Sequence, residues 1–412
     1  HLVGLTSSDG VYIDGQVTVK GDMTGPASAR MVLRDPSVDI AVMETARGGL
    51  IRSGMGYRRC NVAACLNITA DHLGLKGIDT LEQLAEVKRI IIEVAKDCAV
   101  LNADDPLCLQ MADHTEAEYL CYVTTNPEHS LVREHIRSEG RAVVLEKGIN
   151  GEMITIYDKG AHIPLLWTHL IPATLEGIVT HNVQNAMFAT ALAYSLGESL
   201  ENIRHGLRTY TTNFFQSPGR MNIFEGHPFK VILDYAHNPA AIQAMCQTVD
   251  RMEVKGRRLC VLAGPGDRRD EDIQEMAQIA AGHFDHFVCK ADDNRRRRAF
   301  DEIPKILQST LKAAGIKDKD IEVIPDEFEA VEHSLRSARP DDLLVIFGDE
   351  IARCWKQITN FDPGINGKAK ASPGKTKPKN NQTQKAEDFV LNKSQRLIRD
   401  ERGVRLAKEE AD

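Results

Sequence analysis

Two side chains that could bind a divalent cation each come after a short apolar run. Glu44 directly follows residues 39–43, and His72 comes a few positions after residues 61–66. Short apolar runs bounded by polar residues are typical of buried parallel strands, and functional groups gather at the carboxyl ends of such strands. Magnesium is held by oxygen ligands and an occasional nitrogen ligand, so a carboxylate and an imidazole at these positions could form a magnesium site. Taken alone, each is better explained structurally, Glu44 as a solvated strand-end carboxylate and His72 as a polar residue beside Asp71 at a helix start.

A basic side chain lies in the middle of a predicted helix. Residues 80–96 carry apolar residues near helical spacing, and Thr80 is suited to cap that helix at its N-terminus. Lys88 lies within the helix. Its ammonium could reach water and pair with Glu82 or Glu86, or it could be buried, and a buried lysine loses its proton readily.

Three hydrogen-bonding side chains open an Ala-rich segment, which predicts a helix over residues 181–196 closed by Gly197. They are His181, Asn182 and Asn185. The amide of an asparagine offers both a donor and an acceptor, which suits the edge of an adenine base. Capping of the helix by Asn182 is an alternative that can coexist with base binding.

Further candidates follow a predicted linker at residues 214–219. Arg220 comes directly after the linker, and its guanidinium could reach a phosphate across a gap between domains. Asp234 ends the next strand, and His237 and Asn238 come just before a helix whose first residue is a proline. The structural explanation of His237 is a residue beside that helix N-terminus.

Four acidic residues follow the second and third strands of the C-terminal part, namely Asp267, Asp270, Asp292 and Asp293. Carboxylates at these positions could hold a guanidinium through bidentate bonds. An exposed acidic loop that faces the arginine run at residues 295–298 is at least as good an explanation. The arginine run could contact an anionic polymer or simply be solvated.

The elements that must position these residues fall into distinct segments. Residues 1–125 alternate strands with helices and include a hairpin with an Asp-Gly turn at residues 12–17, whereas residues 141–172 resemble small antiparallel strands. From residue 230 to 361, five strands alternate with helices, which is the pattern of a doubly wound parallel sheet. We therefore predict an α/β protein with two domains, residues 1–215 and 216–361.

The remaining residues, 362–412, have a different composition. Lysines stand there among Gly, Pro, Asn and Gln, and 12 basic residues face 8 acidic ones. Such a stretch buries too little apolar area to offset its ordering entropy, so we predict a disordered, solubilising tail rather than a polyanion contact. A short helix after Asp388 is an alternative.

Overall composition excludes several protein classes. The 412 residues include 51 basic and 59 acidic side chains, and the net charge of −8 argues against wholesale nucleic-acid binding. No apolar run approaches the roughly 18 residues that a membrane helix needs. Nine cysteines without a CxxC pair indicate a reduced, cytoplasmic protein. A strand-like run begins almost at His1 without signal-peptide features, so we expect a piece of a larger protein.

Several stretches together resemble one superfamily. Those that resemble Mur ligases and folylpolyglutamate synthases, in order, are residues 44–49, 67–73, Lys88, residues 181–186 and residues 234–239. Three others look like cyanophycin synthetases within that superfamily, namely residues 9–15, 21–30 and 266–272. Any one motif is weak, but five in order at sensible spacing are specific. The resemblance covers residues 1 to about 360 and implies an incomplete Mur-ligase-like central ATPase domain followed by a Rossmann-like C-terminal domain.

This resemblance implies ATP-dependent amide ligation with magnesium. A carboxylate attacks the γ-phosphate of ATP and becomes an acyl phosphate, and an amine then displaces the phosphate. Cyanophycin synthetases build a polymer with an aspartate backbone and arginine branches, and their Mur-like part adds arginine to the aspartate β-carboxylate. The implied partners are therefore cyanophycin, arginine and aspartate, together with further copies of the chain in a homo-oligomer.

Residue roles follow from the same resemblance. It implies that magnesium is held by Glu44 and His72. It implies catalytic roles for Lys88, in carbamylated form, and for His72 and His237. It implies that ATP is bound by His181, Asn182, Asn185, Arg220 and Asp234. The residues that it places at the incoming amino acid are Asn238, Asp267, Arg268, Asp270, Asp292 and Asp293.

One element of the superfamily pattern has no match. The phosphate-binding loop, with its glycines and a Gly-Lys-Ser/Thr ending, is not found in this chain, and residues 364–369 only resemble it superficially. We therefore expect the loop to lie before residue 1 and this fragment alone to be inactive. Two alternatives stay open, another Mur-type peptide ligase and a non-catalytic Mur-like scaffold.

Overall fold

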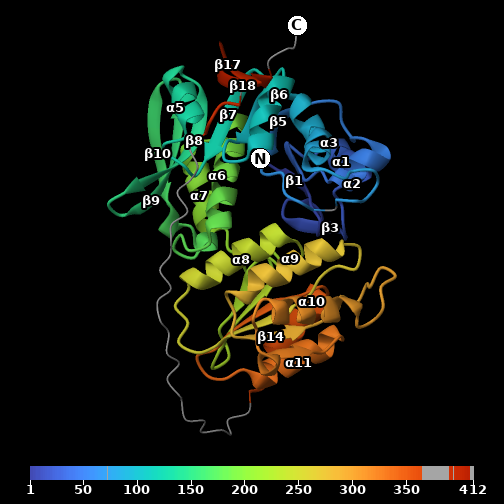
Figure 1. Ribbon diagram of the computed structural model, residues 1–412. Coiled ribbons are helices and arrows are strands. Elements are labelled where there is room, and N and C mark those ends of the chain that lie inside the picture. The colour runs from blue at the N-terminus through green and yellow to red at the C-terminus, as the bar shows by residue number, and fades with distance from the viewer. Residues whose placement is uncertain (72, 364–388, 393, 409–412) are drawn as a thin grey trace.

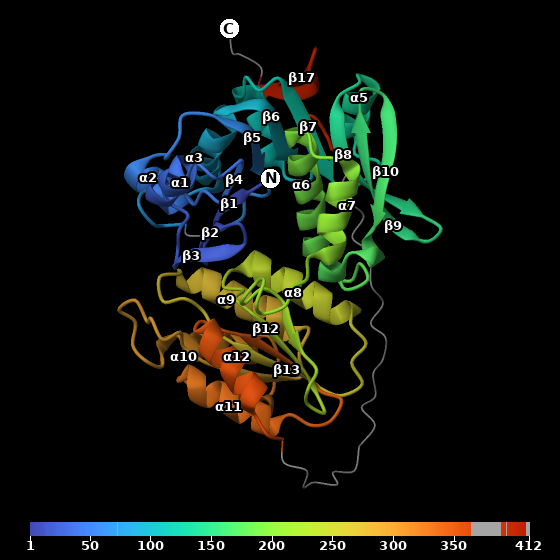
Figure 2. The same cartoon turned by 180° about the vertical axis from the view of Figure 1, so that it is seen from behind.

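The computed structural model describes residues 1–71, 73–363, 389–392 and 394–408. Two large units lie one above the other in Figure 1, with residues 1–209 in the upper unit and residues 222–360 in the lower one. Helices α8 and α9 of the lower unit face the upper unit in both Figure 1 and Figure 2. The α/β architecture predicted from the sequence is confirmed.

A small mixed sheet opens the chain. Its strands pair in the order β3-β2-β1-β4, with β1 parallel to β4 and antiparallel to β2. Asp14 and Gly15 take left-handed φ angles of 49° and 73°, as the predicted tight hairpin turn requires. The elements are β1 (Val3–Thr6), β2 (Gly10–Ile13), β3 (Gln16–Lys20), α1 (Pro26–Arg34), β4 (Ile40–Met43) and α2 (Arg47–Ser53). The expectation of a buried strand at residues 39–43 is wrong in one respect, because β4 is a sheet edge and Val42 is 49% exposed.

The second sheet of the upper unit has six strands in the order β10-β9-β8-β7-β6-β5. Strands β5 to β8 are parallel, whereas β8, β9 and β10 are antiparallel, as predicted for residues 141–172. The strands are β5 (Cys60–Cys65), β6 (Ala95–Asn102), β7 (Tyr119–Thr124), β8 (Arg141–Gly148), β9 (Gly151–Asp158) and β10 (Ala161–Trp167). The central parallel core is thus separate from the first sheet.

Helices cover both faces of this second sheet. One core cluster joins Leu84 and Ile92 of α3 to one face, and another joins Met187 and Phe188 of α6 to the opposite face. Thr80 caps α3 in a capping box with Gln83, as its position predicted. The main helices are α3 (Leu81–Glu93), α4 (Pro106–Gln110), the 3-10 helix η1 (Met111–His114), α5 (Ser130–Arg137), α6 (Thr180–Leu196) and α7 (Leu200–Thr209).

The lower unit is the predicted doubly wound sheet. Its strands pair in the order β11-β12-β16-β13-β14-β15, and all are parallel except the edge strand β11. Helices α8, α9 and α10 pack on one face and α11 and α12 on the other. The elements are β11 (Asn222–Phe224), β12 (Lys230–Asp234), α8 (Pro239–Arg251), β13 (Arg258–Leu262), α9 (Asp270–Ala281), β14 (His286–Cys289), α10 (Glu302–Ala313), β15 (Ile321–Val323), α11 (Glu327–Ser337), β16 (Leu343–Phe347) and α12 (Ile351–Asn360).

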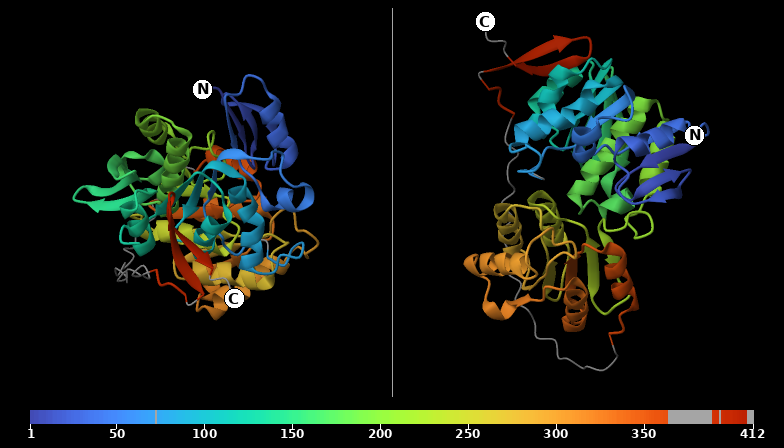
Figure 3. Two further views of the ribbon diagram at one scale, coloured as in Figure 1. Left: turned by 90° about the horizontal axis from the view of Figure 1, so that it is seen from above. Right: turned by 90° about the vertical axis from the view of Figure 1, so that its right-hand side faces the viewer.

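The prediction of a disordered tail is wrong for its last part. Strands β17 (Gln395–Asp400) and β18 (Gly403–Lys408) form a hairpin, not a helix, and the hairpin lies on the upper unit, at the end away from the lower unit (Figure 3). Val404 and Leu406 are 1% and 2% exposed, because they alternate inward along β18 and join the core cluster that also contains Leu84 of α3. Composition misjudged this segment because its apolar residues are buried against another element's core. Residues 364–388, 393 and 409–412 of the predicted tail lie outside the described residues.

Within the described residues, no helix is long and apolar enough to span a membrane.

Candidate active site

The loops that follow β4 and β5 meet the beginning of the lower unit. Glu44 follows β4, and Asp71 belongs to the loop after β5. On the other side stand Arg220, just before β11, and His237, between β12 and α8. Two links cross this junction: the positive charge of Arg220 acts on the Glu44 carboxyl group, and the His237 ring lies close to Asp71. Three of the residues singled out in the sequence, Glu44, Arg220 and His237, therefore lie at the junction between the units.

Glu44 presents its carboxylate at this junction. Its Oε2 accepts a hydrogen bond from the backbone amide of Ser8 at 3.0 Å, which ties the end of β4 to the turn after β1. The pKa of Glu44 is raised because neighbouring atoms partly desolvate the carboxyl group, although the side chain still reaches solvent. The Ser8 amide and the positive charge of Arg220 act in the opposite direction. The Glu44 carboxylate is therefore a partly desolvated anion that lies near the positive charge of Arg220.

The expected magnesium ligands are only partly described. His72 lies outside the described residues, so its placement beside Glu44 stays a prediction. Among the residues that the structure describes, no group of three or more His, Cys, Asp or Glu side chains gathers as a metal-binding cluster. Glu44 therefore fits magnesium through its exposed oxygen atoms, but the described part of the site does not complete a ligand set.

Lys88 points from α3 toward the loop after β5. Its Nζ donates a hydrogen bond to the backbone carbonyl of Asn67 at 3.4 Å, and its side chain is half-buried. The hydrogen bond goes to this loop rather than along the helix to Glu82 or Glu86, the partners of the structural interpretation. Lys88 therefore contacts, from α3, the loop that also carries Asp71.

The start of α6 contains an unsatisfied histidine. Nδ1 of His181 is buried and has no hydrogen-bond partner among the described residues, and burial lowers the pKa of the ring. Asn182 donates to the carbonyl oxygen of Ala173 at 2.8 Å, and Asn185 donates to Asn182 at 3.2 Å. Because a buried ring nitrogen without a partner is costly, a ligand with a hydrogen-bonding edge would complete this position.

Asp234 and Arg220 lie beside each other in the lower unit. The Asp234 carboxylate accepts bonds from the amides of Met221 at 2.7 Å and Ala236 at 2.8 Å, while burial raises its pKa. The guanidinium of Arg220 lies 5.5 Å from the centre of the Tyr235 ring and its side chain is exposed. Arg220 is thus held next to Asp234 with its charged end available at the junction.

His237 faces the upper unit. Its Nδ1 lies 2.8 Å from the carbonyl oxygen of Tyr235, which can only accept, so Nδ1 carries the proton. Its Nε2 is directed toward Asp71 of the upper unit, 3.9 Å from Oδ2. Asn238 caps α8 by accepting from the amide of Ala241 at 2.9 Å, so its side chain has a structural role.

The acidic residues that we expected to bind the incoming amino acid form ion pairs with basic residues of the lower unit. Asp267 pairs with Arg268 and Arg296, and Asp270 pairs with Arg298 at 2.6 Å. Residues 295–298 therefore pair with the acidic loop, which is the structural explanation that the sequence offered as the alternative to substrate binding.

Asp293, the next of these acidic residues, accepts two bonds from Arg353 at 2.6 Å and 3.0 Å. Asp292 lies 3.3 Å from the fully buried ammonium of Lys290. Asp292 and Asp349 lie close enough that the negative charge of Asp292 contributes to raising the Asp349 pKa.

A buried charge network at the carboxyl ends of β14 and β16 was not predicted. Lys290 and Glu327 are both fully buried and 2.7 Å apart, and Glu327 also accepts from Arg353 and from the amides of Asp349 and Glu350. These contacts hold the pKa of Glu327 at about 2 even though burial opposes them. Burial, reinforced by Asp292, raises the pKa of Asp349 to about 6. The strand-end rule that found Glu44 would also have marked Lys290, directly after β14.

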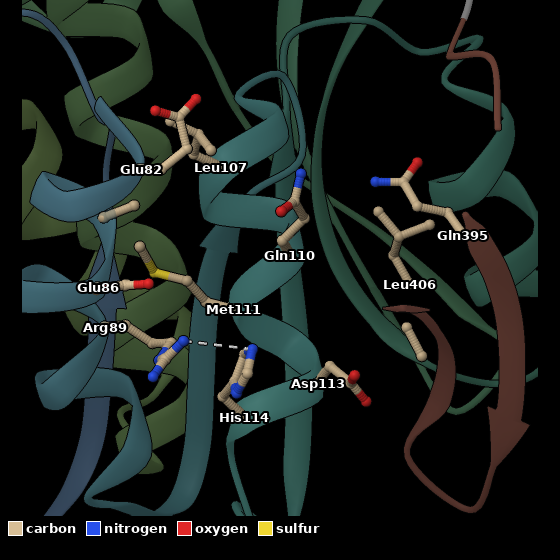
Figure 4. A pocket seen from close by; sticks show the side chains of 12 residues that line it. Glu82, Glu86, Arg89, Leu107, Gln110, Met111, Asp113, His114, Gln395 and Leu406 are labelled. Atoms are coloured by element: carbon tan, nitrogen blue, oxygen red, sulfur yellow. Dashed lines mark hydrogen bonds between the residues drawn. The ribbon is translucent and has the colours of Figure 1, made fainter. Parts of the chain in front are cut away.

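A cavity of about 90 Å³ lies elsewhere in the upper unit. Figure 4 shows Glu82, Glu86 and Arg89 of α3 on one side and Gln395 and Leu406 of the hairpin on the other. None of the residues expected at the active site lines it. The junction between the units, rather than this cavity, remains the candidate site.

Comparison with protein families gives two matches. The Mur ligase middle domain matches residues 3–193, and the Mur ligase glutamate ligase domain matches residues 219–349. Among curated relatives, the chain is 40% identical to a cyanophycin synthetase of Crocosphaera subtropica and 42% identical to one of Synechocystis sp., each over 88% of this chain and 41% of the relative. The chain thus spans about two fifths of the length of these relatives.

More distant relatives and solved structures agree on the fold. A UDP-N-acetylmuramoyl-L-alanyl-D-glutamate--2,6-diaminopimelate ligase of Corynebacterium efficiens is 28% identical over 84% of this chain and 64% of the relative. Folylpolyglutamate synthase of Mycobacterium tuberculosis, complexed with ADP and AMPPCP, superposes with a TM-score of 0.60 at 19% identity, covering 88% of this chain and 86% of that chain. The Yersinia pestis folylpolyglutamate synthase/dihydrofolate synthase, complexed with AMPPNP and Mn, gives 0.61 at 17% identity over 87% and 82%.

Proposed function

The chain belongs to the Mur ligase family, of which it carries the middle and glutamate ligase domains, and we propose that it is the arginine-adding part of a cyanophycin synthetase. In this reaction an aspartate β-carboxylate oxygen attacks the γ-phosphorus of ATP, which yields an acyl phosphate and ADP. The amine of arginine then attacks the acyl carbon, the phosphate leaves, and the amine loses a proton. The convergence of Glu44, Arg220, Asp234 and His237 on one junction supports the proposal.

Charge repulsion is the main obstacle to the first step, since both ATP and the acceptor carboxylate are anionic. We assign the magnesium ligands to Glu44 and His72, and magnesium bound there would neutralise the phosphate charge. Lys88 contacts the loop after β5, and in its carbamylated form it would add a negatively charged group beside this proposed magnesium site. Its ordinary ammonium form would instead neutralise charge directly, and the two forms differ in their dependence on CO₂.

A buried ring nitrogen without a hydrogen-bond partner in the described structure supports ATP binding at the start of α6. The buried Nδ1 of His181 has no partner in the described structure, and Asn182 and Asn185 stand on the same first turns of α6. We assign the adenine to this place and the phosphates to Arg220, whose guanidinium is exposed at the junction. Asp234 would accept from a ribose hydroxyl.

The incoming arginine would approach from the lower unit. Nδ1 of His237 faces a carbonyl oxygen and so carries a proton, and in the neutral ring Nε2 has the lone pair that could accept the proton released by the attacking amine. We expect carboxylates to hold the guanidinium of the incoming arginine. Among them, Asp292 lies near Asp349, and these two carboxyl groups put negative charge at the carboxyl ends of β14 and β16. Asp267, Asp270 and Asp293 would bind it only by exchanging their present arginine partners.

The fuller setting of the activity is also part of the proposal. We place the protein in the cytoplasm as a homo-oligomer that acts on cyanophycin. The second candidate is another Mur-type ligase, which the 28% identity to a diaminopimelate ligase favours. A substrate screen distinguishes the two.

The test uses the longer protein that contains this chain. ADP release is measured with a cyanophycin primer and, in turn, arginine, an aspartyl-arginine dipeptide, glutamate and diaminopimelate. We expect release with arginine, and at least a roughly 100-fold loss in Glu44→Ala and Lys88→Ala. Lys96→Ala is the matched control, because Lys96 is exposed just beyond the same helix and pairs with Asp97. Release that depends on diaminopimelate or glutamate, or that is unchanged in both variants, would reject the assignment.

A further inference from the structure

Arg268 occupies an unusual position between the two units. Its side chain is 5% exposed, although it belongs to the loop between β13 and α9. One guanidinium nitrogen lies 2.9 Å from Oδ1 of Asp71 in the upper unit, and another lies 2.9 Å from Oδ1 of Asp267 in the lower unit. One buried cation therefore bridges carboxylates of both units.

A chain of alternating charges extends from this bridge. Asp71 is followed by Arg268, then by Asp267, then by Arg296. Each anion in the chain lies between cations, because the positive charge of Arg47 also acts near Asp71. A buried guanidinium that loses one of its carboxylates pays a large desolvation cost, so such a chain favours one relative position of its members.

The backbone around Asp267 is shaped for this contact. Arg296 and Arg297 have left-handed φ angles of 47° and 78°, which residues other than glycine rarely adopt. A Cβ atom on Gly266 would lie 2.1 Å from the carbonyl oxygen of Arg295, so only glycine permits this approach. The strained loop is thus pressed against the segment that carries Arg268.

The bridge also sets the position of a reacting group. Asp71 has Oδ1 on Arg268 and Oδ2 3.9 Å from Nε2 of His237. If the lower unit moved away, the His237 ring would leave the loop after β5. Arg268 therefore lies where it can control the distance between His237 and the upper unit.

We propose that Arg268 is a positioning residue, an ionic latch that holds the lower unit against the loop after β5 and so places His237 in the active site. This role replaces substrate binding for Arg268. Its kinetic consequence rests on the proposed function, whereas its structural consequence does not.

The structural test uses hydrogen exchange on the whole chain without substrates. Arg268→Met and Asp71→Asn should each increase amide exchange at least about fivefold in residues 73–79 and 235–238, relative to the exchange of the core strands of each unit. Arg269→Met is the matched control, since Arg269, the N-cap residue of α9, pairs with Asp272 of the same unit and Met keeps its apolar stem. Unchanged exchange in both latch variants would overturn the latch, whatever the enzyme's substrate proves to be.

The kinetic test uses a double-mutant cycle in the longer protein. Each single variant should lower kcat about tenfold or more and leave the KM for ATP within twofold, and the double variant should be no worse than either single one. Arg268→Lys should restore little, because one ammonium does not bridge two carboxylates as a guanidinium does. Effects of Arg268→Met and Asp71→Asn that multiply, or a raised KM for arginine with kcat unchanged, would show that Arg268 acts independently on the substrate and would reject the proposal.

Discussion

The backbone amide of Val404 donates a hydrogen bond to Nδ1 of His135 at 2.9 Å, although 269 residues separate them in the sequence. The opposite ring nitrogen, Nε2, lies 3.1 Å from the carbonyl oxygen of Arg141. Because a carbonyl only accepts, the neutral ring with its proton on Nε2 satisfies both partners. The contact is one of several that hold the terminal hairpin on the upper unit, beside the burial of Val404 and Leu406 and the hydrogen bond from Arg402 to the carbonyl oxygen of Thr115.

The hairpin should contribute to the stability of the upper unit. Leu406→Ala removes a fully buried side chain and should lower the free energy of unfolding by about 2–4 kcal/mol. Leu397→Ala, on the exposed side of the same hairpin, should change it by less than about 1 kcal/mol. Urea unfolding followed by circular dichroism measures both. Equal effects of the two substitutions would mean that the hairpin does not dock in solution.

Docking should also depend on pH through His135. Burial lowers the pKa of this ring to about 4, below its ordinary value near 6.5, so the folded state favours the neutral form. The contribution is complete above pH 6.5 and is lost as the pH falls toward 4, with a loss of about 2 kcal/mol at pH 5. Urea unfolding at pH 7.5 and pH 5 measures it, and His135→Gln should flatten this part of the profile. An unchanged profile in that variant would assign the pH dependence to other groups, such as nearby Asp400.

The buried pair of Lys290 and Glu327 should be sensitive to loss of one partner. Glu327→Gln leaves the fully buried ammonium without its closest anion and should destabilise the lower unit by about 3–5 kcal/mol. Glu332→Gln, one turn further along α11, breaks only an exposed pair with Arg336 and should cost about 0.5 kcal/mol or less. Thermal unfolding compares the two. A small effect of Glu327→Gln would show that the interior there admits water.

Nucleotide binding should depend on His181. If its buried Nδ1 meets the adenine, His181→Ala should weaken ADP binding about tenfold, which corresponds to one lost hydrogen bond of about 1.4 kcal/mol. The control is His169→Ala, an exposed histidine outside the candidate site. Calorimetric titration of ADP into the longer protein provides the measurement. Equal affinity in the variant and the parent would move the base-binding site away from α6.

Local patterns in the sequence were sufficient for most of the fold. The capped helix that carries Lys88, the Asp-Gly hairpin and the alternating strands of the lower unit all depend on residues close to one another in the chain. The same holds for the positions of Glu44 and Asp234, because the end of a strand can be recognised from the few residues around it, although β4 is a partly exposed edge strand rather than a buried one.

Tertiary structure alone decided which charges meet. The sequence placed Asp267 and Arg268 side by side, but only the folded chain brings Arg268 to Asp71 and Arg296 to Asp267. It also buried Val404, in a segment whose composition indicated disorder. The physical reason is the same in both cases. Burial and ion pairing depend on which residues are neighbours in space, and the desolvation cost of a side chain therefore depends on residues that are distant in the sequence.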